Sequence, residues 1–184
     1  MKKSLLPVLG LLTAAGLILG TFSPLNAEEK PVEIVGVAKC KMCHKSAKRG
    51  NQFAVWEKSV HANAFATLAS EQSLAIAKEM GIGDPQKAEE CLYCHTTQAF
   101  LGGITAGTKY TEAEGVSCEA CHGAGSLYKS KKIMVDRDLA VAAGMSPGDK
   151  AVCLKCHNEK SPTFKGFDYK ERWAEIVHPG VATE

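Results

Sequence analysis

The sequence lacks several features that would indicate common activities. It contains no Rossmann glycine fingerprint, no P-loop and no HExxH metalloprotease motif. Its formal net charge is only +2, from 22 basic and 20 acidic residues. These absences give no support for a nucleotide-dependent enzyme or for a protein that binds nucleic acid.

The first 27 residues resemble an export signal. Lys2 and Lys3 precede an apolar run over residues 5–19, and Leu25-Asn-Ala27 provides a small-residue cleavage site. An uncleaved membrane anchor is the alternative, but proline and glycine interrupt the run and no basic flank follows it. We therefore expect a Sec signal peptide over residues 1–27 and a periplasmic or otherwise exported mature protein that does not span the membrane.

The mature chain, residues 28–184, has the length of one domain. Cleavage removes two lysines, so the mature polypeptide has 20 basic and 20 acidic residues and is formally neutral. Large apolar side chains are few, and a core made from them alone would be small. We expect another component to supply buried apolar surface.

Every cysteine belongs to a CxxC pair, and a histidine follows each pair directly. The four motifs are CKMCH, CLYCH, CEACH and CLKCH. Their cysteines are Cys40, Cys43, Cys91, Cys94, Cys118, Cys121, Cys153 and Cys156, and their histidines are His44, His95, His122 and His157. A disulfide framework is the default in an exported protein, and a zinc ribbon or a thioredoxin-like pair are further alternatives. None of these explains a histidine at one fixed position in all four motifs.

The CxxCH pattern is that of covalent haem attachment. The two thiols form thioethers with the macrocycle, and the adjacent imidazole binds the iron from one face. The sequence therefore predicts four haem c groups, each with its iron. Four flat apolar macrocycles would also supply the buried surface that the polypeptide lacks.

Two histidines lie outside the motifs and are candidates for the opposite faces of the irons. Residues 51–69 predict an amphipathic helix, in which His61 shares one stripe with Ala54, Ala64, Phe65 and Leu68. His178 ends a second predicted helix, in the segment FKGFDYKERWAEIVHPG. A histidine on an apolar face is often only a packed core residue, but four irons need second ligands, so we interpret both as distal ligands.

Two segments form a weak internal repeat. In each, an alanine-rich helix ends near a glycine, and a cap residue with a proline follows seven residues before the first cysteine of a CLxCH motif. The dipeptides Asp84-Pro85 and Ser146-Pro147 suit the cap and first position of a following helix. We therefore expect new helices to begin at these two dipeptides.

Several short segments resemble the cytochrome c554 family of periplasmic multihaem cytochromes. The matching pieces are GVAKCKMCH, WEKSVHANA, CLYCHTT, GVSCEACHGAGS and CLKCHNEKSPTF, followed by His178-Pro179. The resemblance implies a mainly α fold, a small multihaem cytochrome c fold with little or no β-sheet, wrapped around four closely packed haems. It also implies electron transfer, with most irons bound by two histidines and room in the pattern for one iron that lacks a sixth ligand.

The sequence departs from the family after the third motif. The family often has a histidine six residues beyond the motif histidine, serving a different haem, and here that position is Tyr128. Our hypothesis is that Met134 replaces it on the haem of Cys40, Cys43 and His44, leaving the haem of His95 five-coordinate. Core packing is the alternative for Met134, as it is for Met80 and Met145.

Three functions fit these observations. The favoured one is a periplasmic carrier that passes electrons between redox partners, such as other cytochromes or a quinone-linked membrane complex. The second is a reductase of nitric oxide, hydroxylamine or peroxide at a five-coordinate haem. The third is a subunit of a larger cytochrome assembly, whose neighbour donates missing ligands. Lys129, Lys131 and Lys132 form a local basic cluster, for which we favour a solvated surface over a docking face.

Overall fold

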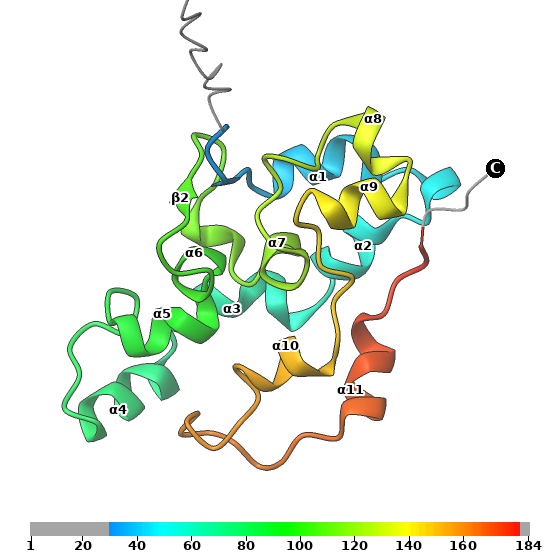
Figure 1. The fold of residues 1–184 in the computed structure, drawn as a ribbon. Coiled ribbons are helices and arrows are strands. Elements are labelled where there is room, and N and C mark those ends of the chain that lie inside the picture. Colours follow the sequence, from blue (N-terminus) through cyan, green and yellow to red (C-terminus); the bar gives the residue numbers. More distant parts are fainter. Residues whose placement is uncertain (1–29, 181–184) are drawn as a thin grey trace, which may run out of the picture.

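The computed structural model describes residues 30–180, a chain of short helices joined by loops (Figure 1). The predicted signal peptide and its cleavage site lie outside the described residues. The α-helices are α1 Val37–His44, α2 Gln52–Glu57, α3 Ala64–Thr67, α4 Glu71–Glu79, α5 Glu89–His95, α6 Thr97–Phe100, α7 Cys118–His122, α8 Lys131–Met134, α9 Arg137–Ala142, α10 Lys150–Leu154 and α11 Tyr169–Ile176. Three 3₁₀ turns accompany them: η1 Ala47–Arg49, η2 Val60–Asn63 and η3 Glu112–Glu114.

The sheet is minimal. β1 (Glu33–Ile34) pairs in parallel with β2 (Thr105–Ala106), with Glu33 opposite Thr105. Ile34 is fully buried and packs with Tyr110 and Ala124. The prediction of a mainly α chain with little β-sheet is confirmed.

Two glutamates join the start of α1 to the region of the third motif. The carboxylate of Glu119, which is buried within α7, accepts hydrogen bonds from the backbone N–H groups of Val35 (2.8 Å), Gly36 (2.8 Å) and Gly125 (2.6 Å). Glu114 accepts one from Val37 at 2.9 Å. Because the first N–H groups of a helix have no partner within it, these carboxylates satisfy and stabilise the N-terminus of α1.

The single helix predicted over residues 51–69 is wrong, because the chain breaks into α2, η2 and α3. The break falls at Ser59, which is extended and whose hydroxyl donates to the carbonyl of Trp56 at 2.7 Å. On either side of it, the indole of Trp56 and the carbonyl of His61 both bond to the backbone of Val116, at 2.9 and 3.0 Å. The two short helices therefore pack separately against this segment, although the predicted stripe remains the less exposed face.

The repeat is confirmed in its first half and wrong in its second. α4 and α9 end just before Gly81 and Gly144, which both have positive φ. No helix begins at the proline of either predicted cap, since α5 starts at Glu89 and α10 at Lys150. The reason is local: the side chains of Asp84 and Ser146 each accept a hydrogen bond from the N–H two residues later, which closes a turn instead.

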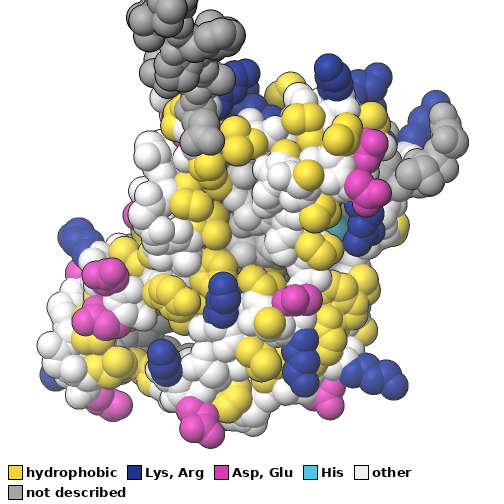
Figure 2. Space-filling model, in the orientation of Figure 1, with side chains coloured by type: hydrophobic (Ala, Val, Ile, Leu, Met, Phe, Trp, Pro, Cys, Tyr) yellow, Lys and Arg dark blue, Asp and Glu magenta, His cyan; other side chains and the backbone are white. Residues whose placement is uncertain are grey.

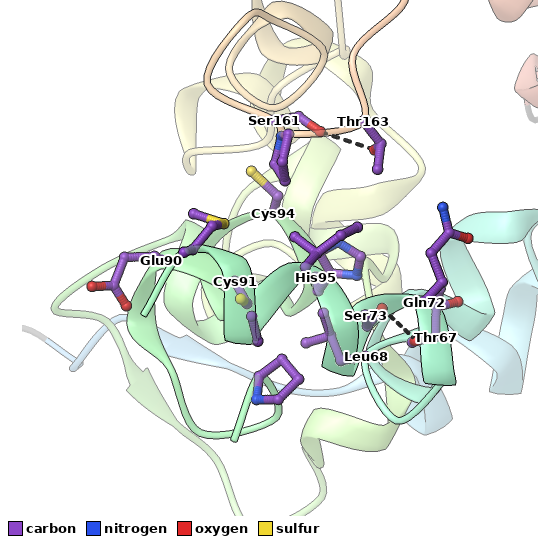
Figure 3. A pocket seen from close by; sticks show the side chains of 15 residues that line it. Thr67, Leu68, Gln72, Ser73, Glu90, Cys91, Cys94, His95, Ser161 and Thr163 are labelled. Carbon is purple, nitrogen blue, oxygen red and sulfur yellow. Dashed lines mark hydrogen bonds between the residues drawn. The ribbon is translucent and has the colours of Figure 1, made fainter. Parts of the chain in front are cut away.

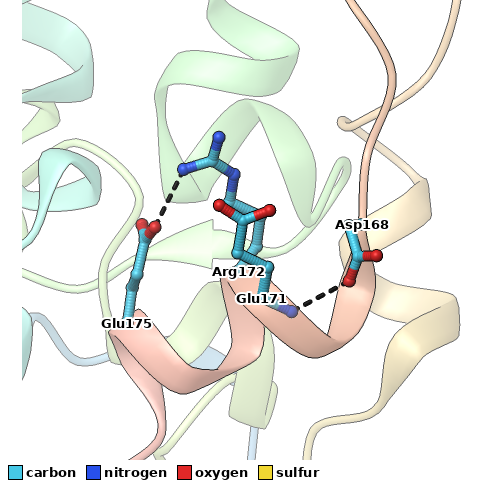
Figure 4. Close-up of polar contacts among 4 residues, drawn as sticks. All are labelled: Asp168, Glu171, Arg172 and Glu175. Carbon is cyan, nitrogen blue, oxygen red and sulfur yellow. Dashed lines mark hydrogen bonds and ion pairs between the residues drawn. The ribbon is translucent and has the colours of Figure 1, made fainter.

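α11 begins with a side-chain cap. The carboxylate of Asp168 accepts a hydrogen bond from the N–H of Glu171 at 2.9 Å, and Arg172 pairs with Glu175 at 2.8 Å (Figure 4). The helix ends at Ile176, two residues before the predicted His178. Proline disfavours the helical conformation in the residue before it, so His178 lies in extended chain beyond the helix.

The buried apolar core is small. Ten apolar residues are buried in the described part of the chain, and four of them are alanines: Ala77, Ala120, Ala124 and Ala140. A core of this composition contributes little hydrophobic stabilisation, since alanine buries little surface. This agrees with the expectation that another component supplies apolar surface.

Candidate haem-binding sites

Each CxxCH motif lies on or directly after a short helix. The first three motifs fall on α1, α5 and α7, and the fourth begins on α10 and ends just beyond it. Cysteines three residues apart on a helical turn lie on the same face, with the histidine one position further. All eight cysteines are free thiols in the described structure, which fits attachment sites and not a disulfide framework.

Three of the four motif histidines have one ring nitrogen fixed by a hydrogen bond. The Nδ1 of His95 faces the carbonyl of Ala64 at 2.6 Å, and that of His122 faces the carbonyl of Ser146 at 2.7 Å. The Nδ1 of His44 lies 3.1 Å from the side-chain oxygen of Gln52. Acceptors at Nδ1 hold the proton there and leave the lone pair of Nε2 free for a metal.

The two histidines outside the motifs each face a motif histidine. The ring centroids of His61 and His157 are 6.0 Å apart, and those of His122 and His178 are 5.8 Å apart. Metal–nitrogen bonds of about 2 Å place two imidazole rings on opposite faces of one metal with centroids roughly 6 Å apart. Both separations therefore fit a pair of axial ligands to one iron.

The environment favours the neutral form of these rings. Burial, and then the neighbouring His157, lower the pKa of His61, and burial lowers that of His157. Burial, followed by His122, lowers the pKa of His178. The Nδ1 of His178 is buried with no hydrogen-bond partner among the described residues.

Cysteines of different motifs contact one another in a definite order. A hydrogen bond to Cys118 and burial raise the pKa of the Cys40 thiol, which joins the first motif to the third. A hydrogen bond to Cys156 lowers the pKa of Cys94 to about 7, which joins the second motif to the fourth.

The third motif lies close to the fourth. Burial, and then the nearby Cys153, raise the pKa of Cys121 to about 11. The attachment sites therefore follow one another in the order first, third, fourth, second.

A cavity of about 240 Å³ opens beside the second motif (Figure 3). Its walls come from α3, α4, α5 and the loop after α10. The lining residues are Thr67, Leu68, Gln72, Ser73, Ile76, Ala77, Met80, Pro85, Glu90, Cys91, Cys94, His95, Ser161, Pro162 and Thr163. His95 is the one histidine among them, so no imidazole opposes it across this cavity.

Tyr128, at the position where the resemblance leads one to expect a histidine, is buried against the third motif. Its hydroxyl donates to the carbonyls of Gly123 (2.5 Å) and His122 (3.2 Å). Burial raises its pKa, so the phenol stays protonated. Both contacts bind it to backbone, and its donor proton is already used.

The methionines differ in exposure. Met134 is half-buried in α8, and no contact of its sulfur decides whether it binds iron or packs. Met80 is 48% exposed, so the idea that it packs in the core is wrong. Met145 is half-buried.

Sequence reasoning missed Gln52 and Glu119. Gln52 carries no periodic signal, because its partner His44 lies on the preceding helix, 8 residues away, and its partner Pro179 lies 127 residues away. Glu119 stands between two cysteines, and several small residues follow it in Ala-Cys-His-Gly-Ala-Gly. A charged residue among small neighbours is a sequence signal that could have indicated its burial. Within residues 30–180, no cluster of three or more His, Cys, Asp or Glu could hold a bare metal ion, which leaves the zinc alternative without a site.

Comparisons with known proteins agree with this chemistry. The profile of the family described as cytochrome c554 and c-prime matches residues 39–123. Cytochrome c-554 of Nitrosomonas europaea is 30% identical over 173 residues, which cover 84% of this chain and 70% of that protein. No solved structure matches the chain.

The helical fold and the CxxCH sites define a c-type cytochrome, an electron-transfer protein that carries haem c with its iron. The chain belongs to the cytochrome c554 family. Among residues 30–180, no helix is both long and apolar enough to cross a membrane.

Proposed function

We propose that the protein is a tetrahaem electron carrier, with one haem at each CxxCH motif. The observation that carries the proposal is the pairing of histidine rings, His61 with His157 and His178 with His122, at separations that suit two ligands on one iron. Haem iron supplies reversible one-electron chemistry, and tunnelling between neighbouring haems passes the electron along. The polypeptide binds the groups, fixes their spacing and tunes their potentials.

In this proposal the eight motif cysteines form the thioethers, and the motif histidines are the proximal ligands. His61 is the distal ligand of the fourth motif's haem, and His178 that of the third. The thiol contacts of Cys40 with Cys118 and of Cys94 with Cys156, and the proximity of Cys121 to Cys153, support a single series of close haems. Attachment converts these thiols to thioethers, so they no longer titrate.

The haems of His44 and His95 have no histidine partner in this arrangement. We propose Met134 as the distal ligand of the first, as the nearest methionine in sequence beyond Tyr128. Met134→Ala would then remove a methionine–iron charge-transfer band and one low-spin haem. An unchanged spectrum would reject Met134 as a ligand.

A second candidate function is favoured by the cavity beside His95. An iron there without a sixth ligand would leave room for a small molecule such as nitric oxide, hydroxylamine or peroxide. The side chains that reach the cavity include Ser161 and Thr163, whose hydroxyls lie 3.3 Å apart (Figure 3). Turnover of such a substrate at a rate matching electron supply would favour this reading over a carrier.

We place the mature protein, residues 28–184, outside the cytoplasm as a single domain. The predicted signal peptide and the need for haem attachment at CxxCH support this assignment. Its partners would be other cytochromes or a quinone-linked membrane complex.

The first test is a haem count on the purified exported protein. Intact mass and the pyridine haemochrome spectrum should give four covalent haems per chain. Removing one motif, with Cys153→Ala and Cys156→Ala, should reduce the count to three. A count below four in the unaltered protein would contradict the proposal.

A further inference from the structure

The segment that carries the first motif is basic and exposed. Over residues 34–56 the sequence contains no aspartate or glutamate. It contains five cations, of which four are exposed and one, Arg49, is half-buried; the exposed ones are Lys39, Lys41, Lys45 and Lys48. We call this surface of α1 and η1 the basic face.

Within the described residues no carboxylate forms an ion pair with the basic face, although Glu114 and Glu119 lie near Cys40 at the start of α1. The ion pairs between residues 30 and 180 are Lys87 with Asp84 and Arg172 with Glu175, and neither involves this segment. Lys41 lies 4.4 Å from the ring of Phe53, a contact that leaves its charge in place. Dark blue side chains gather along the upper edge of Figure 2, the end of the molecule where α1 lies in Figure 1.

The first motif is also the most open of the four. Cys43 is the one exposed cysteine of the eight, and Met42 beside it is 70% exposed. In the third motif, by contrast, Glu119 and Ala120 are buried. An exposed thioether edge with an apolar side chain at its centre and cations around it has the composition of a docking site, an apolar centre within a charged rim.

We propose that the basic face docks an acidic redox protein, whose redox centre exchanges one electron with the haem attached at Cys40 and Cys43. This rests on the proposed function, since it requires a haem at the first motif. Charge complementarity selects the partner: an acidic surface is drawn to five cations, and steering of this kind raises association rates 10-fold or more. The two propionates of one haem would offset at most part of this charge.

The position of the first motif in the series of sites supports an entry or exit role. The proximity of Cys40 and Cys118 joins it to the third motif, and the third lies near the fourth through Cys121 and Cys153. An electron delivered at Cys43 thus enters at one end of the series. The partner is oxidised by one electron as the haem iron is reduced by one, or the reverse.

The test is stopped-flow reduction of the ferric holo-protein by fully reduced flavodoxin, an acidic flavin protein, in which one electron passes per encounter. The variant is Lys39→Glu with Lys48→Glu. The matched control is Lys78→Glu with Lys165→Glu, two exposed lysines on α4 and on the loop before α11, at the opposite end of the molecule in Figure 1. Both variants change net charge by the same amount.

We expect the rate constant of the basic-face variant to fall about tenfold at low ionic strength. The rate constant of the control should fall less than about fivefold. The difference should vanish near 1 M salt, where charges are screened. Equal losses in the two variants, or a larger loss in the control, would overturn the proposal.

Two measurements separate this proposal from the proposed function. Haem content and the rate with a small uncharged reductant should match the unaltered protein in both variants. Absence of four haems would reject the tetrahaem assignment itself. With four haems present, a flavodoxin rate that does not depend on salt would reject only the docking face. If the double variant fails to mature, Lys48→Gln, outside the motif, should give a smaller loss of the same sign.

Discussion

Gln52 shows how one side chain links two haem-binding segments. Its oxygen accepts from Nδ1 of His44, while its amide nitrogen donates to the carbonyls of Pro179 (2.8 Å) and Arg49. Because the nitrogen faces two carbonyls, the orientation of the amide is fixed. A side chain at Gly50 would come within 2.8 Å of this nitrogen, so the close approach requires glycine there.

Replacing Gln52 tests this link. Gln52→Ala should raise the potential of the first motif's haem, since His44 loses an acceptor and becomes a weaker donor to iron. Gln52→Glu should lower it, because a charged acceptor strengthens the ligand. We expect shifts of opposite sign, each on the order of 50 mV, in a spectroelectrochemical titration. Shifts of the same sign would show that Gln52 acts only through packing.

At the scale of single residues, the sequence was sufficient to identify features that depend only on local spacing. The cysteines and histidines of CxxCH are defined by their neighbours, so the motif could be identified without a fold. The identity of the motif histidine that faces His61 or His178 depends on how distant segments meet. Neither helical period nor spacing carries that information.

Glu119 controls an element boundary, the start of α1. Its carboxylate accepts hydrogen bonds from three backbone N–H groups, those of Val35 and Gly36 just before α1 and that of Gly125 after α7. Glu119→Ala should destabilise the holo-protein by about 3 kcal/mol, since each buried donor left unpaired costs about 1 kcal/mol or more. Thermal unfolding with the haems attached would measure this. If Glu119→Ala lowered the unfolding free energy as little as Lys78→Ala, on the exposed face of α4, the stabilising role of the Glu119 carboxylate would be contradicted.

Glu114 should give stability a distinct pH dependence. Burial, with repulsion from Glu119, raises its pKa, while the hydrogen bond from Val37 opposes that rise. A raised carboxyl pKa means that the folded state holds the proton more tightly than the unfolded chain does. Its stabilising contribution is therefore present below the usual carboxyl pKa, near 4.5, and is lost as pH rises through the raised value.

Glu114→Gln should remove this part of the pH dependence. Denaturant unfolding at several pH values between about 4 and 7 would measure this. The free energy of unfolding of the variant should fall less with rising pH than that of the unaltered protein. Identical pH profiles for the two proteins would mean that the pKa of Glu114 is not raised.

The errors at the element scale have two causes, tertiary contacts in one case and local side-chain turns in the other. The stripe from Ala54 to Leu68 indicated the buried face correctly, but periodicity does not show where tertiary contacts interrupt a helix. Trp56 and His61 both bond to Val116, a residue far along the chain. The caps at Asp84 and Ser146 failed because side-chain turns competed with helix initiation.

At the scale of the whole molecule, the described residues bury few large apolar side chains against one another. Its buried cluster consists of Ile34, Tyr110 and Ala124, and much of the remaining buried apolar set is alanine. We expect the chain without haem to lose most of its helical structure, because the short helices are marginal without packing.

Cytoplasmic expression of residues 28–184, where attachment does not occur, would provide this haem-free chain. Far-UV circular dichroism should show low helicity and no cooperative thermal transition. A haem-free chain that unfolds cooperatively from full helicity would show that the polypeptide alone specifies the fold.

The mainly helical fold could be predicted from the sequence, because the segments around the CxxCH motifs resemble a known family. The order of the attachment sites could not, since Cys40 meets Cys118 and Cys94 meets Cys156 only in the folded chain. In the proposed tetrahaem protein, that order would make the haems one series with the first motif at its end.

Quantitative electron paramagnetic resonance of the ferric holo-protein tests the central claim most directly. The unaltered protein should contain two low-spin haems of the bis-histidine type, His61→Ala or His178→Ala should each leave one, and the double variant none. A bis-histidine signal that keeps its full intensity in either single variant would contradict the pairing of His61 with His157 and of His178 with His122.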